Sequence, residues 1–195
     1  MISKDDSGGF LDRIVTYLNL HRGVRTVISQ AWELLLQSKL SPVLHRASNQ
    51  LNVAASHAPE RAIFVEDLLS RLLNNGDMSV ESDTACRDAV SSLKLMYQAD
   101  YLENHTTEVQ RQSSGLIWTW PVLLSGVYTD LLQKRQPEAM IILCFYAVLL
   151  HQRRSMWFVD SAGRMLIESV TKSLGSYWRH WLDWPNQVIG GTFIS

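Results

Sequence analysis

The titratable residue best placed to do chemistry is His151, which follows a run of twelve apolar residues and precedes a polar stretch, 152–154. A histidine there can exchange a proton near neutral pH, or hydrogen-bond the polar end of an apolar ligand. The simpler interpretation is that its ring interacts with the carbonyl groups at a helix end. Tyr128 and Asp160 are the other acid–base candidates, and neither lies in a recognisable catalytic motif.

The six histidines and two cysteines are not spaced as metal ligands. None of the histidines forms a ligand-like cluster such as His-Glu-x-x-His. Cys86 and Cys144 lie far apart, outside any Cys-x-x-Cys, which is typical of reduced, buried thiols in an intracellular protein. No phosphate-binding loop and no Gly-x-Ser-x-Gly occurs. We therefore expect no metal and no cofactor.

Six of the seven tryptophans lie between residues 118 and 184. Trp178, Trp181 and Trp184 fall within an arc of about 120° on a helix, which is typical of a packing face. So much aromatic surface either builds a core or lines a pocket, because apolar, aromatic-lined concavities hold lipophilic ligands. The sequence alone leaves both alternatives open.

The 195 residues carry a net charge of −1, with 46% apolar and 19% charged residues. This composition is typical of a globular protein and gives no overall attraction to DNA or to an anionic membrane. The apolar run 139–150 is shorter than the roughly 20 residues that span a bilayer. The first residues lack the apolar core of a signal peptide. We expect an intracellular protein without a membrane span, in the cytoplasm, the nucleus or both.

Helical periodicity dominates the chain, and no stretch alternates as a half-buried strand does. The predicted fold is a single all-α domain of about eight to nine helices. Residues 1–17 form a partly flexible N-terminal segment, residues 18–195 form the domain, and a mobile loop lies near 105–117. Pro185 is expected to end the last helix, and residues 188–194 can form a short extended tail. The predicted helices cover residues 23–39, 59–73, 79–104, 121–135, 137–151, 155–174 and 178–184.

Several motifs resemble the C-terminal half of fungal zinc-cluster transcription factors, and within them the sterol-uptake control regulators. They are Trp-x-Trp-Pro at 118–121, the apolar helix at 137–151, Met-Trp-Phe at 156–158, Gly-Arg-Met-Leu-Ile at 163–167 and Trp-x-x-Trp-Leu-x-Trp-Pro at 178–185. Residues 20–25 and 38–44 are similar to an earlier signature of the same regulatory domain. The resemblance therefore spans about residues 18–190.

The resemblance implies an all-helical, non-catalytic domain that binds a sterol-like lipophilic molecule in a hydrophobic pocket and regulates transcription. Two departures from the family follow. The cysteines of the Zn₂Cys₆ cluster are absent, so we expect no direct nucleic-acid contact by this chain. Helices that precede the Leu-x-x-Gly signature in the family are also absent, which would expose apolar surface and favour a partner or a homodimer.

The candidate ligand-binding residues are Trp118, Trp120, Met140, Cys144, His151 and Trp157, with His151 as the polar anchor. Gly190 and Gly191 would form a flexible flap. Two alternatives remain open. One is a stand-alone enzyme of secondary metabolism that cyclises or rearranges a lipophilic substrate with His151, Asp160 and Tyr128. The other is a helical interaction module that binds a partner helix.

Overall fold

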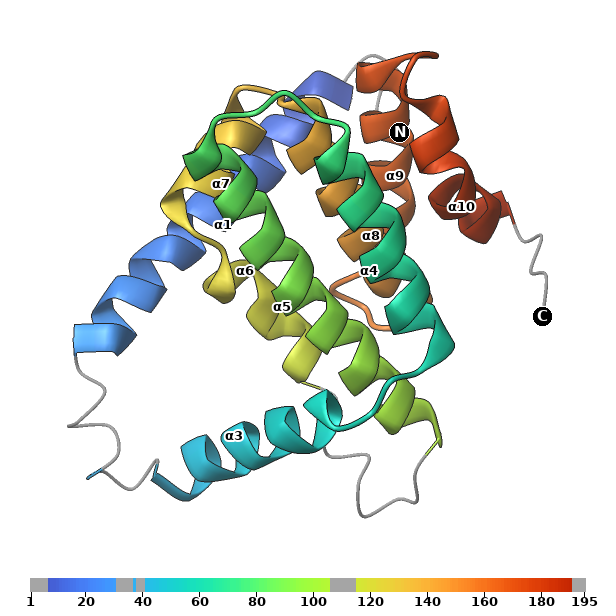
Figure 1. Ribbon diagram of the computed structural model, residues 1–195. Helices are drawn as coiled ribbons and strands as arrows, with labels where there is room; N and C mark the ends of the chain where they lie inside the picture. Colours follow the sequence, from blue (N-terminus) through green and yellow to red (C-terminus); the bar gives the residue numbers. More distant parts are fainter. Residues whose placement is uncertain (1–6, 31–36, 38–40, 106–114, 191–195) are drawn as a thin grey trace.

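The computed structural model describes residues 7–30, 37, 41–105 and 115–190, and within these residues every regular element is a helix (Figure 1). This confirms the predicted all-α fold. The elements are α1 (Ser7–Gln30), α3 (Ser41–Ala55), α4 (Glu60–Asn74), α5 (Val80–His105), the 3₁₀ helix η2 (Leu116–Thr119), α6 (Trp120–Leu123), α7 (Gly126–Gln133), α8 (Pro137–Gln152), α9 (Ala162–Leu174) and α10 (Arg179–Gly190).

The helices α4 and α5 begin and end within one residue of their predicted bounds. Pro59 precedes α4 in extended geometry (φ −64°, ψ 143°), and Glu60 lies in the first turn, where a negative charge stabilises the helix. At the start of α5, the backbone N–H of Ser82 donates to the hydroxyl of Ser79 over 3.3 Å. Local capping chemistry therefore sets these boundaries.

The helix α8 forms the centre of the molecule and is buried along nearly its whole length. It packs against α4, α5, α7, α9 and α10. An ordinary amphipathic helix exposes one polar face to solvent, and α8 has no such face. Two tyrosine hydroxyls reach its backbone. Tyr97 on α5 donates to the carbonyl oxygen of Phe145 over 2.7 Å, and Tyr128 on α7 donates to that of Ala139 over 2.9 Å.

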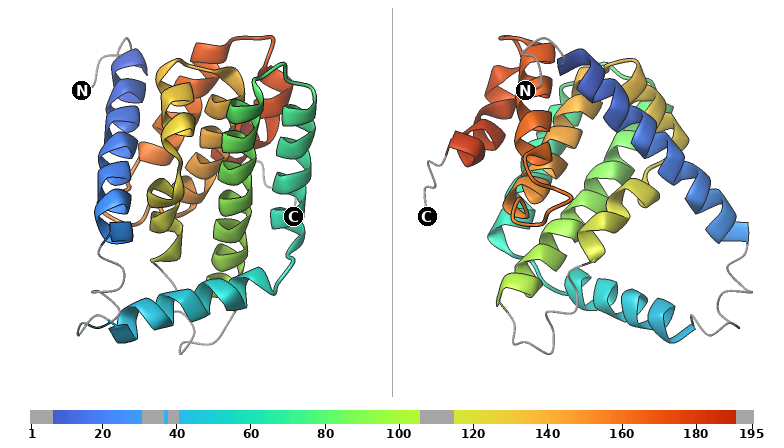
Figure 2. Two further views of the ribbon diagram at one scale, coloured as in Figure 1. Left: turned by 60° about the vertical axis from the view of Figure 1, so that its left-hand side comes forward. Right: turned by 180° about the vertical axis from the view of Figure 1, so that it is seen from behind.

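Figures 1 and 2 show how the other helices cover this centre. The helices α4 and α5 run side by side, and α3 crosses the end of α5. On another side α1 packs against α6, α7 and α9 through Leu11, Val15 and Leu18. The last helix, α10, lies against α8 and α9. Trp184 on α10 stacks on Phe145 at a ring-centroid distance of 5.4 Å.

Gly163 permits the close approach of α9 to α8. A Cβ atom at this position would lie 2.3 Å from the backbone nitrogen of His151 and 2.7 Å from the carbonyl oxygen of Ala147. Real Cβ atoms essentially never come this near to other atoms, so only glycine fits without a shift of the backbone.

Two predicted helices are shorter than expected. Residues 153–161 form consecutive turns instead of the start of a helix at residue 155, and α9 begins only at Ala162. Asp160 has a φ of 41°, which an α-helix does not allow. The helix predicted over 121–135 is interrupted at Leu124, and Ser125 caps α7 by accepting from the backbone N–H of Tyr128.

At the C-terminus, α10 continues through Pro185 instead of ending there. Proline inside a helix costs about 3 kcal/mol, but the helix is held by burial of Leu182, Pro185, Val188 and Ile189. Residues 188–190, expected to be extended, are therefore helical. Gly190 is the last helical residue and Gly191 lies outside the described residues, as does the rest of the expected tail.

At the N-terminus, the predicted boundary between residues 17 and 18 falls inside α1. Of the predicted helix over 23–39, residues 23–30 belong to α1, and 31–36 and 38–39 are outside the described residues. In the predicted loop near 105–117, residues 106–114 are likewise not described, and Leu116 and Ile117 are buried in η2.

Candidate functional site

Three of the six candidate ligand-binding residues lie inside the closed core. Trp120, Met140 and Cys144 are each 0% exposed. The indole N–H of Trp120 donates to the carbonyl oxygen of Ala89 over 3.1 Å, and its ring stacks on Tyr146 at 4.4 Å. Burial raises the pKa of the Cys144 thiol far above its ordinary value, so this cysteine is an apolar packing group. A ligand could reach these three side chains only by opening the core.

Two other candidates, Trp118 and Trp157, meet at the surface around a third aromatic residue, Phe158. The ring of Phe158 lies 5.2 Å from that of Trp118 and 5.7 Å from that of Trp157. Trp157 is 90% exposed and Phe158 is 56% exposed, whereas Trp118 is partly buried. We call these three residues the aromatic surface set. Phe158 is part of the Met-Trp-Phe motif but was not among the predicted ligand-binding residues. Its contact with Trp118 joins residues 40 positions apart, which no local sequence pattern indicates.

The sixth candidate, His151, lies at the end of α8, immediately before the turns that carry Trp157 and Phe158. It is buried, and its Nδ1 atom has no hydrogen-bond partner within the described part of the chain. Burial lowers the pKa of the imidazole, and the positive charges of Arg154 and Arg164 lower it further. The ring is therefore held in its neutral form, which can accept or donate a hydrogen bond.

The three acid–base candidates are not brought together in a cleft. Tyr128 is fully buried with its hydroxyl bound to Ala139, and burial raises its pKa well above 10.0. Asp160 is exposed in the turns of 153–161. Neither these two residues nor His151 lines either of the two clefts described below. Within the described residues, no hydrogen bond joins any two of these three side chains, as a proton-transfer pair would require.

A buried ion-pair cluster fixes the segment that follows α8. The guanidinium of Arg153 contacts Asp100 over 2.7 Å and Glu103 over 2.6 Å, both on α5, and the Arg153 and Asp100 side chains are more than nine-tenths buried. These carboxylates raise the pKa of Arg153 although its burial alone lowers it. Residues fifty positions apart in sequence form this cluster, so periodicity gave no signal for it. It anchors one end of the turns that carry Trp157 and Phe158.

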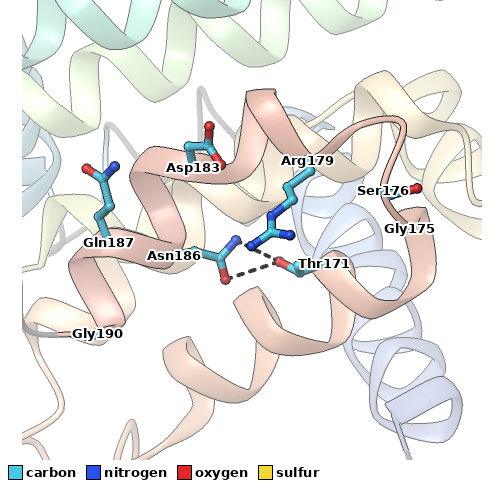
Figure 3. Close-up of a pocket in the computed structure, with 8 residues that line it drawn as sticks. All are labelled: Thr171, Gly175, Ser176, Arg179, Asp183, Asn186, Gln187 and Gly190. Atoms are coloured by element: carbon cyan, nitrogen blue, oxygen red, sulfur yellow. Dashed lines mark hydrogen bonds between the residues drawn. The ribbon is translucent and has the colours of Figure 1, made fainter.

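A polar cleft of about 560 Å³ lies between α10 and the C-terminal end of α9 (Figure 3). We call it the α9–α10 cleft. Thr171 on α9 and Asn186 on α10 lie together in one wall of it, where the side-chain amide of Asn186 donates to the Thr171 hydroxyl over 3.0 Å. Gly175, with a φ of 69°, ends α9 and turns the chain toward α10. The residues that line the α9–α10 cleft are Thr171, Gly175, Ser176, Arg179, Asp183, Asn186, Gln187 and Gly190.

A second cleft, of about 510 Å³, lies between the start of α4 and the end of α5. Asp100 of the buried ion-pair cluster forms part of it, together with Arg61 and Tyr101. The Tyr97 hydroxyl in its lining is already bound to Phe145. The Tyr97 hydroxyl and the Asp100 carboxylate in this cleft are therefore already bound to other parts of the protein.

The described residues form neither a metal site nor a membrane span. They contain no group of three or more His, Cys, Asp or Glu side chains able to hold a metal ion. None of their helices combines the length and apolar character that crossing a bilayer requires.

The sequence is similar over most of its length to part of a fungal protein. It is 28% identical over 182 residues to a Zn(2)-C6 fungal-type transcription factor of Gibberella zeae. The match covers 89% of this chain and 34% of that protein, so the chain spans about a third of the length of its relative. No protein-family profile and no solved structure matches the chain. The similarity supports a relation to fungal zinc-cluster factors, and the sterol-uptake branch stays a prediction.

Proposed function

We propose that this chain is a regulatory domain of a fungal transcription regulator and that it responds to a sterol-like lipophilic molecule. The observation that carries the regulatory role is the similarity of nearly the whole chain to one third of a zinc-cluster factor. Such a factor reads DNA with a cluster that needs six cysteines, and this sequence has two, both buried. The chain therefore acts in the nucleus on the activity of a regulator, without touching DNA itself.

The lipophilic ligand is proposed to bind at the aromatic surface set. A tryptophan and a phenylalanine that are 90% and 56% exposed keep a large apolar area in water, and contiguous exposed apolar patches mark binding sites. A flat, fused-ring ligand would cover Trp157 and Phe158 and remove that area from water, at roughly 25 cal/mol per Å². His151 precedes the turns that carry Trp157 and Phe158. Its Nδ1 atom has no hydrogen-bond partner among the described residues, which supports the proposal that it anchors a ligand hydroxyl.

A binding experiment tests the ligand. Purified protein is titrated with ergosterol while its tryptophan fluorescence is followed. We expect a saturable change that Trp157→Ala weakens at least tenfold, since 1.4 kcal/mol corresponds to a factor of ten. The matched control is Tyr177→Ala, because Tyr177 is an aromatic residue 79% exposed at another place on the surface. Absence of a saturable change, or equal binding by Trp157→Ala, contradicts the sterol proposal.

A reporter experiment tests the regulatory role separately. The chain is fused to an unrelated DNA-binding domain in a fungal host that carries a matching reporter gene. We expect reporter expression to depend on the chain and to change when sterol synthesis is inhibited. A fusion whose reporter output equals that of the DNA-binding domain alone contradicts the regulatory role. A chain-dependent output that is insensitive to sterol contradicts only the ligand.

A further inference from the structure

We propose that the α9–α10 cleft binds a small zwitterion of the amino-acid type, with its carboxylate on Arg179 and its ammonium group on Asp183. This site is distinct from the aromatic surface set in position and in chemistry. The cleft is lined by hydroxyl, amide and charged side chains, which suit a polar ligand and not a sterol (Figure 3). Its volume of about 560 Å³ lies within the range usual for small-molecule sites.

The two charged residues of the cleft lie one helical turn apart but form no ion pair in the described structure. Arg179 and Asp183 have the i, i+4 spacing that brings side chains together on a helix. At the same spacing Asp67 contacts Arg71, and Asp83 contacts Arg87. In those pairs the acidic residue comes first, which is the favourable order. Arg164 and Glu168 on α9 have the basic residue first, as in α10, and they approach only to 3.9 Å. The cleft therefore presents a separate positive and a separate negative charge.

The guanidinium of Arg179 is surrounded by neutral polar groups. Figure 3 shows it extending toward Thr171 and Asn186. No hydrogen bond of this guanidinium to any described residue is found, so its donors are available to a ligand carboxylate, which matches their planar, forked geometry. The hydroxyl of Ser176, also in the lining, can add a further donor.

The wall beside Arg179 is fixed by hydrogen bonds. The side-chain amide of Asn186 donates to the Thr171 hydroxyl over 3.0 Å and to the carbonyl oxygen of Leu182 over 2.8 Å. These bonds connect α9 to α10 and hold both side chains before a ligand arrives. A preformed wall lowers the entropy lost on binding. It also leaves Arg179 and Asp183 as the two groups that recognise opposite ends of a zwitterion.

Opposite charges in one cleft select the class of ligand. A phosphate or a dicarboxylate would meet the repulsion of Asp183, and a simple amine would meet that of Arg179. An α-amino acid carries one carboxylate and one ammonium group a few ångströms apart, so it satisfies both residues. The two residues are exposed, so solvent screens each contact and both contacts are needed for measurable binding.

The test is ligand-observed NMR with the twenty L-amino acids, each at up to about 10 mM, a concentration at which a site of millimolar affinity is occupied. We expect saturable binding of at least one amino acid. Its N-acetyl derivative lacks the ammonium group and its amide lacks the carboxylate, so both should bind at least tenfold more weakly. Arg179→Gln and Asp183→Asn should each weaken binding of the intact amino acid at least tenfold.

Matched variants control for the change in net charge. Arg71→Gln and Asp67→Asn alter the exposed pair on α4 and should leave binding unchanged. The proposal is overturned if no amino acid binds, if the N-acetyl derivative binds as well as the amino acid, or if Arg179→Gln and Asp183→Asn bind like the wild type. Circular dichroism establishes whether each variant is folded. If a single variant is unfolded, binding is measured with the double variant Arg179→Gln/Asp183→Asn in its place. None of these results depends on ergosterol binding.

Discussion

Trp120 and Trp157 belong to the same aromatic-rich stretch of sequence, but the structure uses them in opposite ways. Trp120 is fully buried, with its N–H bound to Ala89 and its ring on Tyr146. Trp157 is 90% exposed, and its ring contacts that of Phe158, another exposed side chain. Residue type alone does not separate a framework tryptophan from one available to a partner. The hydrogen bond of the indole and the layer of covering helices do.

The largest expected effect contrasts these two tryptophans directly. Trp120→Ala should lower the free energy of unfolding by about 3–5 kcal/mol, since it leaves a cavity and removes a buried hydrogen bond. Trp157→Ala should change it by no more than about 0.5 kcal/mol. Urea denaturation of both variants measures the difference. Similar losses for the two variants would mean that the surface tryptophan is also part of the framework.

The next effect concerns the ion-pair cluster that anchors the turns carrying Trp157 and Phe158 to α5. Arg153→Gln should cost about 3 kcal/mol, because it leaves the carboxylate of Asp100 buried without its counter-charge. The control is Arg154, the neighbouring exposed residue. Arg154→Gln should lower the free energy of unfolding by less than about 0.5 kcal/mol. Urea denaturation serves again as the measurement. Equal stability of the two variants would show that the cluster does not hold this segment.

A third, smaller effect concerns the other end of the same segment, where α9 meets α8. Gly163→Ala should destabilise the protein by about 2–3 kcal/mol, because the new Cβ atom collides with backbone atoms of α8. Gly23→Ala is the matched control. It lies in α1 with nothing within 4 Å of the added atom, and should stabilise the protein by about 0.5–1 kcal/mol. Thermal unfolding of both variants measures the contrast, and a neutral Gly163→Ala contradicts it.

The smallest effect is the pH dependence of stability at His151. Its pKa in the folded protein lies below the ordinary 6.5, so below pH 6.5 the unfolded chain binds more protons than the folded one. The free energy of unfolding of the wild type should therefore decrease as the pH falls through 6.5. Above pH 6.5, His151 should contribute no pH dependence. Relative to His151→Gln, the wild type should become less stable at acid pH. Parallel stability curves for the two proteins would contradict this.

The sequence predicted those parts of the molecule that local chemistry determines. Proline and acidic residues at helix starts located α4, α5 and α8, and the period of the apolar residues gave the all-α fold. Turns at 153–161 escaped prediction because Arg153 is held by α5, fifty residues away. Pro185 was expected to end a helix, and tertiary burial of α10 outweighs that local preference. Likewise, no spacing rule could distinguish the closed surroundings of Met140 from the open surroundings of Trp157.

The burial of α8 on all sides has a consequence for synthesis on the ribosome. Its covering helices α4, α5 and α7 precede it in the chain, but α9 and α10 follow it. When α8 leaves the ribosome, part of its apolar surface has no cover until residues 162–190 have been translated. A nascent chain at that stage exposes a segment prone to aggregation, which chaperones recognise. The order of the helices thus makes residues 162–190 the part of the chain that must be translated before α8 is fully covered.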